Sequence, residues 1–291
     1  MPKSIALIGF ASGLGARYPG CADGAPHLQR SGLDRYLGEH GLRAEWKTML
    51  HPNMSDERPL EARIGELNDA LEAHVRRALE TGEVPFVIGG DHTSAVGTWR
   101  GTFAGLKQMP LGLLWVDAHM DAHTPESSHS GLLHGMPLAV LLGHCGEKAP
   151  PCSPILRPEH ICIVGARSYE TEEAALLESI GVRIYHMDEI RTRGLPAVMH
   201  EAHAKVRNGT FNYGITVDVD SIDPLEAPGV GTPEENGLSA KELTALLQEI
   251  CAVAAPAAIE LAEFNPHHDR DDATLNIAME LCLALTQHTA S

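Results

Sequence analysis

The stretch from Leu111 to His134, LGLLWVDAHMDAHTPESSHSGLLH, begins with an apolar run and ends among acids and histidines. The run LGLLWV contains no polar residue, which is typical of a strand covered on both faces of a parallel sheet. Four polar side chains follow it at alternate positions: Asp117, His119, Asp121 and His123. Residues two apart in an extended chain project to the same side, so we expect these side chains to converge beyond the strand.

A buried cluster of carboxylates needs a positive partner, because burying an unpaired charge is costly. The chain offers no lysine or arginine between Lys107 and Lys148. The segment DAHMD places three side chains that can bind a metal on one side of the chain, at a spacing of two. This segment alone does not decide between a metal site and a solvated polar cluster, so the ends of the other strands must be considered.

Further apolar runs of strand length recur along the chain: SIALIGF, VPFVIGG, HICIVGA, VRIYHMD, YGITVDVD and AAIELAEF. Helices are expected between and after them, over residues 59–80, 171–180, 195–206, 239–253 and 273–286. Ser239 and Glu242 have the spacing of a capping box. Apolar strands that alternate with helices indicate a mostly parallel, doubly wound sheet. No repeat or linker divides the chain, so we predict a single α/β domain over residues 1–291.

Composition narrows the class of protein. With 291 residues and 43% hydrophobic content the chain can bury a large core. A formal charge of −17 argues against a nucleic-acid partner or an anionic membrane. No apolar stretch approaches the roughly 20 residues of a membrane span, and the N-terminal residues do not resemble a signal peptide. We expect a cytoplasmic protein.

The cysteines give no signal of pairing. They are scattered over the chain: Cys21, Cys145, Cys152, Cys162, Cys251 and Cys282. Without paired short spacings they predict neither a zinc knuckle nor a disulfide framework, and we expect them to be reduced.

The ends of three other strands also carry acids or a histidine. VPFVIGG leads to Asp91 and His92, YGITV leads to Asp218 and Asp220, and AAIELA leads to Glu263. Taken alone, GGDH is typical of a tight turn, and DVD is typical of a solvated loop or a helix cap. However, ligands of open α/β sheets bind beyond the carboxyl ends of the strands. Together with DAHMD, these strand ends predict a metal site.

The candidate donors are two histidines and four aspartates: His92, His119, Asp117, Asp121, Asp218 and Asp220. Imidazole and carboxylate without thiolate suit Mn²⁺ better than a structural zinc, and they also suit Fe²⁺, Co²⁺, Ni²⁺ or a catalytic Zn²⁺. Four carboxylates exceed what one catalytic ion with open positions requires. Two ions that share bridging carboxylates would use them all, and would lower the pKa of a water bound between them.

Five segments together resemble the ureohydrolases, the arginase and agmatinase family. These segments are GGDHT (89–93), VDAHMDAHTP (116–125), SGLLHGMPLA (130–139), VDVDSIDP (217–224) and EFNP (263–266). They occur in the family's order, and the resemblance covers nearly the whole chain, from about Gly20 to Asp272. SGLLHGMPLA and HTPE are most similar to the arginases. The resemblance implies a three-layer α/β/α sandwich, two Mn²⁺ per chain and assembly into homo-oligomers, usually trimers or hexamers.

The resemblance also implies a role for each donor. The first manganese would be held by His92, Asp117, Asp121 and Asp218. The second would be held by His119, Asp117, Asp218 and Asp220, so that Asp117 and Asp218 bridge the two ions.

Three residues are implied in the chemistry of a guanidino substrate. His134 would assist proton transfer and Glu263 would bind the guanidinium group, while Asp121 is placed to relay a proton to the departing amine. Without the resemblance, His134 would be an ordinary loop histidine and Glu263 a strand-end acid paired with Arg270. The glycine-rich segment GFASGLGARYPG lacks the spacing of a nucleotide-binding loop.

The substrate's identity depends on positions where the chain departs from arginases. Ser130 is retained, but His123 and Leu132 stand where arginases have asparagine. His123 and Ser130 would then hold the α-carboxylate, and Glu170 the α-ammonium group. L-arginine, cleaved to L-ornithine and urea, is the leading candidate.

Several alternatives to arginine cleavage remain. Agmatine, guanidinobutyrate and other ω-guanidino acids are alternative substrates. A deacetylase-like hydrolase would release acetate instead of urea, and a non-catalytic metabolite-binding homologue would bind manganese without turnover.

Overall fold

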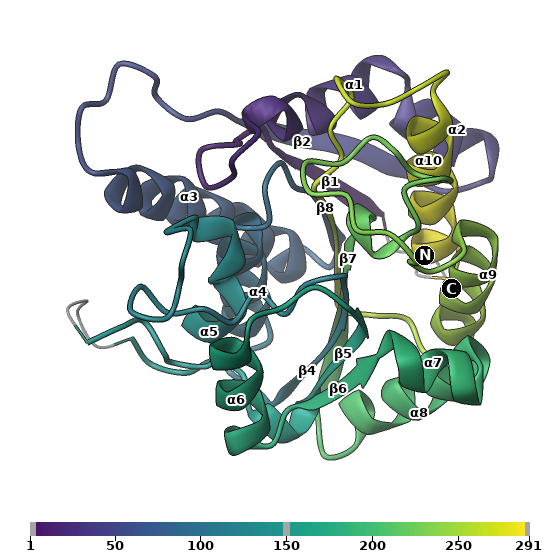
Figure 1. Ribbon diagram of the computed structural model, residues 1–291. Coiled ribbons are helices and arrows are strands. Elements are labelled where there is room, and N and C mark those ends of the chain that lie inside the picture. The colour runs from purple at the N-terminus through teal and green to yellow at the C-terminus, as the bar shows by residue number, and fades with distance from the viewer. Residues whose placement is uncertain (1–3, 148–151, 289–291) are drawn as a thin grey trace.

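The computed structural model describes residues 4–147 and 152–288 (Figure 1). Within these residues lies one sheet of eight strands in the order β2-β1-β3-β8-β7-β4-β5-β6. Every neighbouring pair is parallel. The strands are β1 (Ile5–Phe10), β2 (Ala44–Leu50), β3 (Val84–Ile88), β4 (Leu111–Val116), β5 (Ile161–Ala166), β6 (Arg183–His186), β7 (Asn212–Asp218) and β8 (Ala258–Ala262).

Helices cover both faces of the sheet (Figure 1). One face carries α1 (Gly24–Arg30), α2 (Leu33–Glu39), α7 (Met187–Arg193), α8 (Leu195–Arg207), α9 (Ala240–Val253) and α10 (Ala273–Thr286). The other carries α3 (Leu60–Glu80), α4 (Ser94–Gly105), α5 (Pro137–Leu141) and α6 (Thr171–Ile180). In β1, Leu7 belongs to the core on the first side, whereas Ile8 packs with Leu71 of α3 on the second. The expected three-layer α/β/α sandwich is confirmed.

The apolar runs became strands because both faces of this sheet are buried. All residues of β1, β3, β4, β5 and β8 are buried, so no solvent-facing position interrupts their hydrophobic sequence. The sequence analysis missed β2, whose sequence AEWKTML is polar at alternate positions. This strand lies at the edge of the sheet, and Lys47 on it pairs with Glu83 at 2.9 Å.

The predicted capping box at Ser239 is wrong. Ser239 precedes α9, but its side chain makes no capping hydrogen bond. Instead, the backbone N–H of Ala240 donates to Glu226 at 3.1 Å, so a distant carboxylate satisfies the first turn. A capping box does form at α6, where Glu170 is the N-cap and Glu173 is the third helical residue.

The expectation that all cysteines are reduced is also wrong. Cys145 and Cys152 form a disulfide between residues seven positions apart, with their Cα atoms 6.1 Å apart. The remaining cysteines are free and buried: Cys21, Cys162, Cys251 and Cys282. A single pair within one loop produces no repeated spacing, so the sequence pattern gave no sign of it.

The strand order determines where the site forms. Strands β3, β8, β7 and β4 are neighbours at the centre of the sheet, although they come from distant parts of the chain. Because all strands are parallel, their carboxyl ends lie along one edge, and the polar residues that follow them meet there. Within residues 4–147 and 152–288 no helix combines the length and apolarity that crossing a bilayer requires.

Candidate functional site

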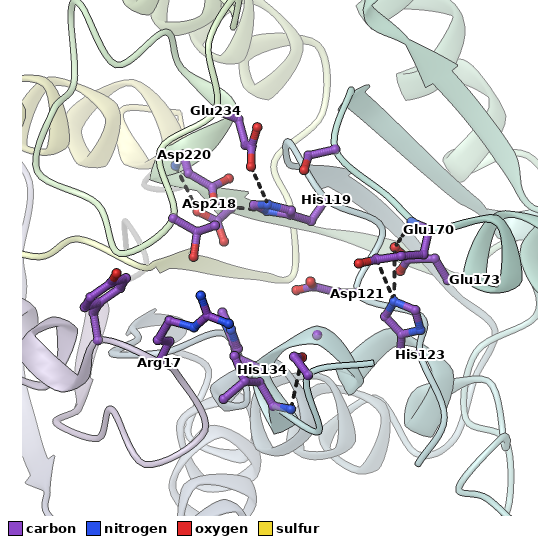
Figure 2. Close-up of a pocket in the computed structure, with 16 residues that line it drawn as sticks. Arg17, His119, Asp121, His123, His134, Glu170, Glu173, Asp218, Asp220 and Glu234 are labelled. Carbon is purple, nitrogen blue, oxygen red and sulfur yellow. Dashed lines mark hydrogen bonds and ion pairs between the residues drawn. The ribbon is translucent and has the colours of Figure 1, made fainter. Parts of the chain in front are cut away.

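A cavity of about 310 Å³ opens beyond the carboxyl ends of the central strands (Figure 2). Eight of the predicted site residues line it: His119, Asp121, His123, Ser130, His134, Glu170, Asp218 and Asp220. The other three are buried behind this lining: His92, Asp117 and Glu263. The structure therefore brings all the predicted residues to one place.

His92 follows β3 and is surrounded by carboxylates. Its Nδ1 lies 3.2 Å from Asp117 Oδ2, 2.9 Å from Asp121 Oδ2 and 3.2 Å from Asp218 Oδ2. Its Nε2 lies 3.1 Å from the hydroxyl of Thr216, which donates its hydrogen to Glu260 at 2.9 Å. Nε2 must therefore donate to Thr216, which leaves Nδ1 to face the three aspartates.

This arrangement fits a metal ion. Nδ1 of His92 is buried and has no well-formed hydrogen bond among the described residues. Burial lowers the pKa of His92, but the close approach of the three aspartates to the imidazole outweighs that effect and raises the pKa well above its usual value. A positive charge between the imidazole of His92 and the three carboxylates would therefore stabilise this arrangement. A divalent cation supplies that charge and accepts the lone pair of Nδ1.

A second group of donors lies beside the first and shares one residue with it. Nδ1 of His119 lies 3.1 Å from Asp220 Oδ2 and 3.5 Å from Asp117 Oδ1. The donor atoms of His92, Asp117 and Asp218 lie within 4.8 Å of one another, and so do those of Asp117, His119 and Asp220. Asp117 therefore belongs to both groups, as a bridging ligand would.

The carboxylates of these groups repel one another. Burial raises the pKa of Asp218 well above its usual value, and the charges of Asp220 and Asp117 add to the increase. Burial and the charge of Asp117 also raise the pKa of Asp121, to about 6. For Asp117 itself burial acts in the same direction, but His119 and His92 outweigh it and hold its pKa below the usual range. Cations between these side chains would relieve the repulsion.

Neighbouring donors fix the carboxylates in place. The indole N–H of Trp115 donates to Asp117 Oδ2 at 2.8 Å, and the backbone N–H of His119 donates to Asp117 Oδ1 at 2.7 Å.

Two site residues have left-handed backbone conformations that are strained for non-glycine residues, Asp121 with φ 50° and Glu263 with φ 65°. Such strain is typical of functional sites, where the surrounding structure compensates for it.

Glu263 and His134 form a partly buried pair beside the metal-donor groups. Oε1 of Glu263 lies 3.0 Å from His134 Nδ1 and accepts the backbone N–H of His92 at 3.0 Å. Burial lowers the pKa of His134, but the contact with Glu263 outweighs it and raises the pKa to about 9. The second oxygen, Oε2, is buried and has no hydrogen-bond donor among the described residues. Glu263 thus pairs with His134 rather than with Arg270, and its Oε2 is a buried acceptor with no partner among the described residues.

Two of the three predicted head-group residues, His123 and Glu170, contact each other in the cavity wall (Figure 2). Nε2 of His123 lies 2.8 Å from Glu170 Oε2 and 3.5 Å from Glu173 Oε1, and Nδ1 lies 3.0 Å from the hydroxyl of Ser127. Glu173 is itself held by the backbone N–H groups of Glu170 and Ala122. Both nitrogens of His123 therefore already have partners within the protein.

The sequence analysis missed several residues that support the site. Glu260 accepts hydrogen bonds from Ser94, Thr98 and Thr216, and through Thr216 it orients His92. Its signal was an acid in the middle of the apolar strand AIELA. Trp115, which orients Asp117, gave no signal because it reads as an ordinary strand residue.

Two further missed residues line the cavity itself. Glu234 approaches Nε2 of His119 at 3.8 Å. Arg17 lies on the glycine-rich loop after β1, which the sequence analysis considered only as a nucleotide-binding loop.

We expect Mn²⁺ to stabilise the protein strongly, because it would neutralise the buried aspartates. Each ion that binds only the folded state adds about 2.7 kcal/mol when its free concentration is 100 times its Kd. Calorimetric melting of chelator-treated protein, titrated with MnCl₂, measures the effect, and metal analysis should find two ions per chain. Mg²⁺, which has little preference for imidazole, is the control and should stabilise much less. An unchanged Tm with Mn²⁺ would contradict the metal assignment.

Comparisons with known proteins give a consistent picture. The model of the arginase family matches residues 3–287. Arginase from Brevibacillus brevis is 32% identical over 290 residues, which cover 97% of this chain and 97% of that protein. The crystal structure of arginase from Bacillus subtilis has a TM-score of 0.89 and 32% identity, covering 97% of this chain and 98% of that one. Formimidoylglutamase from Bacillus subtilis has a TM-score of 0.82 and 25% identity, covering 99% and 88%. Proteins with this fold are therefore named for different substrates.

Proposed function

The chain belongs to the arginase family, and from this premise we propose that it is a manganese-dependent ureohydrolase that cleaves L-arginine to L-ornithine and urea. One observation carries the proposal above all. Two donor groups share Asp117, and Glu263 offers a buried, unpaired carboxylate oxygen beside them. A metal pair and an acceptor for a planar cation are the two components that hydrolysis of a guanidinium group requires.

The ligands proposed for the two ions are His92, Asp117, Asp121 and Asp218 for one, and His119, Asp117, Asp218 and Asp220 for the other. When bound, the ions would lower the pKa of a water molecule and supply a strong nucleophile near neutral pH. Mn²⁺ is proposed because the donors are oxygen and imidazole, and Co²⁺, Ni²⁺ or Zn²⁺ would also accept them.

Glu263 is proposed to bind and orient the guanidinium group. A guanidinium carbon is a poor electrophile, because its charge is delocalised over three nitrogens, so the geometry of attack matters. The free Oε2 of Glu263 can accept an N–H of the substrate, and the carboxylate's charge complements the cation. Fixing the plane of the group next to the aspartates lowers the entropic cost of attack.

His134 and Asp121 are proposed to move the protons. The amine departs only after its nitrogen gains a proton, and Asp121 lines the cavity next to His92, where it can relay one. With its pKa raised to about 9, His134 is protonated at neutral pH and serves as the proton source from the cavity side.

Arginine is favoured over 4-guanidinobutyrate by the acid at the rim of the cavity. Glu170 lines the cavity and is half exposed, so its carboxylate can pair with an α-ammonium group that 4-guanidinobutyrate lacks. We propose that the enzyme acts as a single domain over residues 1–291, in the cytoplasm, as a homo-oligomer such as a trimer or hexamer.

We expect the manganese-loaded protein to hydrolyse L-arginine with a kcat/KM at least about 100-fold above that for agmatine or 4-guanidinobutyrate. Each of these lacks one polar group of the amino-acid head and leaves its partner unpaired, at about 1–3 kcal/mol. A colorimetric assay of urea release measures kcat/KM for each substrate, and the chelator-treated protein is the control. N-formimidoyl-glutamate, assayed by formamide release, tests the other substrate named among the structural neighbours.

Other outcomes would change the proposal in defined ways. A preference for agmatine or 4-guanidinobutyrate would leave the ureohydrolase class standing and overturn arginine as the substrate. Acetate release from an acetylated amine would indicate a deacetylase. Manganese binding without release of any product would indicate a metabolite-binding homologue.

A further inference from the structure

The cavity is strongly acidic, and one permanent cation lines it. Its acidic lining residues are Asp121, Glu170, Glu173, Asp218, Asp220 and Glu234. The proposed ions would offset the charges of the three aspartates, and the three glutamates remain as acids outside the proposed metal ligands. Among the described residues that line it, Arg17 is the one lysine or arginine. A substrate with a guanidinium at one end and a carboxylate at the other would find acids for its cation, but would need a positive group for its anion.

The position expected to hold the carboxylate is already engaged. His123 contacts Glu170 at 2.8 Å through Nε2 and Ser127 at 3.0 Å through Nδ1, so both nitrogens have partners. Leu132 has no polar side-chain atom. Ser130 offers a single neutral hydroxyl, and its oxygen accepts the backbone N–H of Leu132 at 3.3 Å. None of these side chains supplies a free positive charge.

Arg17 is free to bind a ligand. Its side chain makes no hydrogen bond or ion pair with any residue in the described part of the chain, and Figure 2 shows it extending towards the cavity near His134. A guanidinium with five N–H donors can hold a carboxylate through two parallel hydrogen bonds, which a single imidazole cannot do.

The loop that carries Arg17 is held firmly against the catalytic side of the cavity. The backbone N–H of Gly15 donates to Asp91 Oδ2 at 2.8 Å, and the backbone N–H of His134 donates to the carbonyl of Gly15 at 3.3 Å. A side chain at residue 15 would meet Cγ2 of Thr93 at 2.5 Å, so glycine is needed for this close approach. Arg17 is thus two residues from a point fixed to His134 and to the turn after β3.

We propose that Arg17 binds the carboxylate of the substrate, and that His123 acts as a positioning residue that orients Glu170 towards the α-ammonium group. Arg17 would then compensate for the two asparagines that this chain lacks. The inference rests on the proposed ureohydrolase function and identifies its substrate class as ω-guanidino acids.

The test compares substrates that differ in the carboxylate. Arg17→Met keeps the length of the side chain and removes its charge. We expect kcat/KM for L-arginine and 4-guanidinobutyrate to fall about 10- to 50-fold, mainly through KM, with agmatine unchanged within about twofold. Arg17→Lys should recover part of the loss, because it restores the charge without the two-pronged geometry. Arg30→Met, at an exposed arginine of α1, is the matched control and should change nothing.

Binding gives the same comparison without turnover. L-ornithine carries the carboxylate and putrescine does not. Titration calorimetry of the manganese-loaded protein should therefore show that Arg17→Met weakens the binding of L-ornithine and leaves the binding of putrescine unchanged. An equal loss for arginine and agmatine, or no loss for either, would overturn the role of Arg17. Preference of the unmodified enzyme for agmatine would instead overturn the proposed substrate. If the enzyme prefers agmatine or releases no urea, the binding of L-ornithine still tests Arg17. Binding that Arg17→Met weakens supports the role of Arg17, and binding that it leaves unchanged overturns that role.

Discussion

Glu263→Gln is expected to lower kcat/KM for L-arginine about 1000-fold. The change keeps the shape of the side chain but removes the charge that we propose pairs with the guanidinium group, and breaking a buried charged pair costs about 2–5 kcal/mol. The amide would also disturb Oε1, which accepts from the backbone N–H of His92 and contacts His134. Steady-state urea release at several arginine concentrations gives kcat and KM separately.

The control for this variant is Glu178→Gln, which removes a charge from an exposed position of α6. It should leave kcat/KM unchanged. Metal content should remain at two ions in Glu263→Gln, because Glu263 lies outside both donor groups. A loss of less than about tenfold, or a loss of metal, would show that Glu263 does not hold the guanidinium group.

Asp117→Asn is expected to remove metal from the site and to lower urea release by at least about 1000-fold. Asp117 is shared by both donor groups, so a neutral amide weakens both at once. Its amide nitrogen would also face a donor, since Trp115 and the backbone of His119 each donate to one oxygen of Asp117. Metal analysis of the purified variant, alongside the urea assay, measures both effects.

Asp220→Asn provides the comparison, because Asp220 belongs to one donor group. It should keep one ion and lose less activity than Asp117→Asn does. If Asp117→Asn retained two ions per chain, the shared position of Asp117 in the structure would not reflect a bridging role.

The sequence predicted the parts of the fold that depend on local pattern. A strand buried on both faces must be apolar along its length, so LGLLWV and its counterparts were recognisable, whereas the half-exposed edge strand β2 was not. The proposed metal donors were recognisable for a similar reason. They follow central strands, and parallel strands bring their carboxyl ends to one edge.

The rest depended on which distant groups meet, and sequence spacing does not carry that information. His123 and Glu170 are 47 residues apart, and their contact is the basis of the positioning role that we propose for His123. Arg17 gave no pattern at all, because its importance arises from the acidity of a cavity built by other segments. The spacing of Cys145 and Cys152 likewise gave no sign that they form a disulfide.

The order of strands also governs when the site comes into being as the chain is synthesised. Strands β3 and β4 are separated in the sheet by β8 and β7, which are the last strands along the chain. Until residues 212–262 have emerged, His92 and Asp117 have no sheet to join them, and these long-range pairings are the slow ones to form. We therefore expect a nascent or truncated chain that lacks these residues not to bind the proposed metal ions. Recovery of urea release during refolding would then report that the whole sheet has formed.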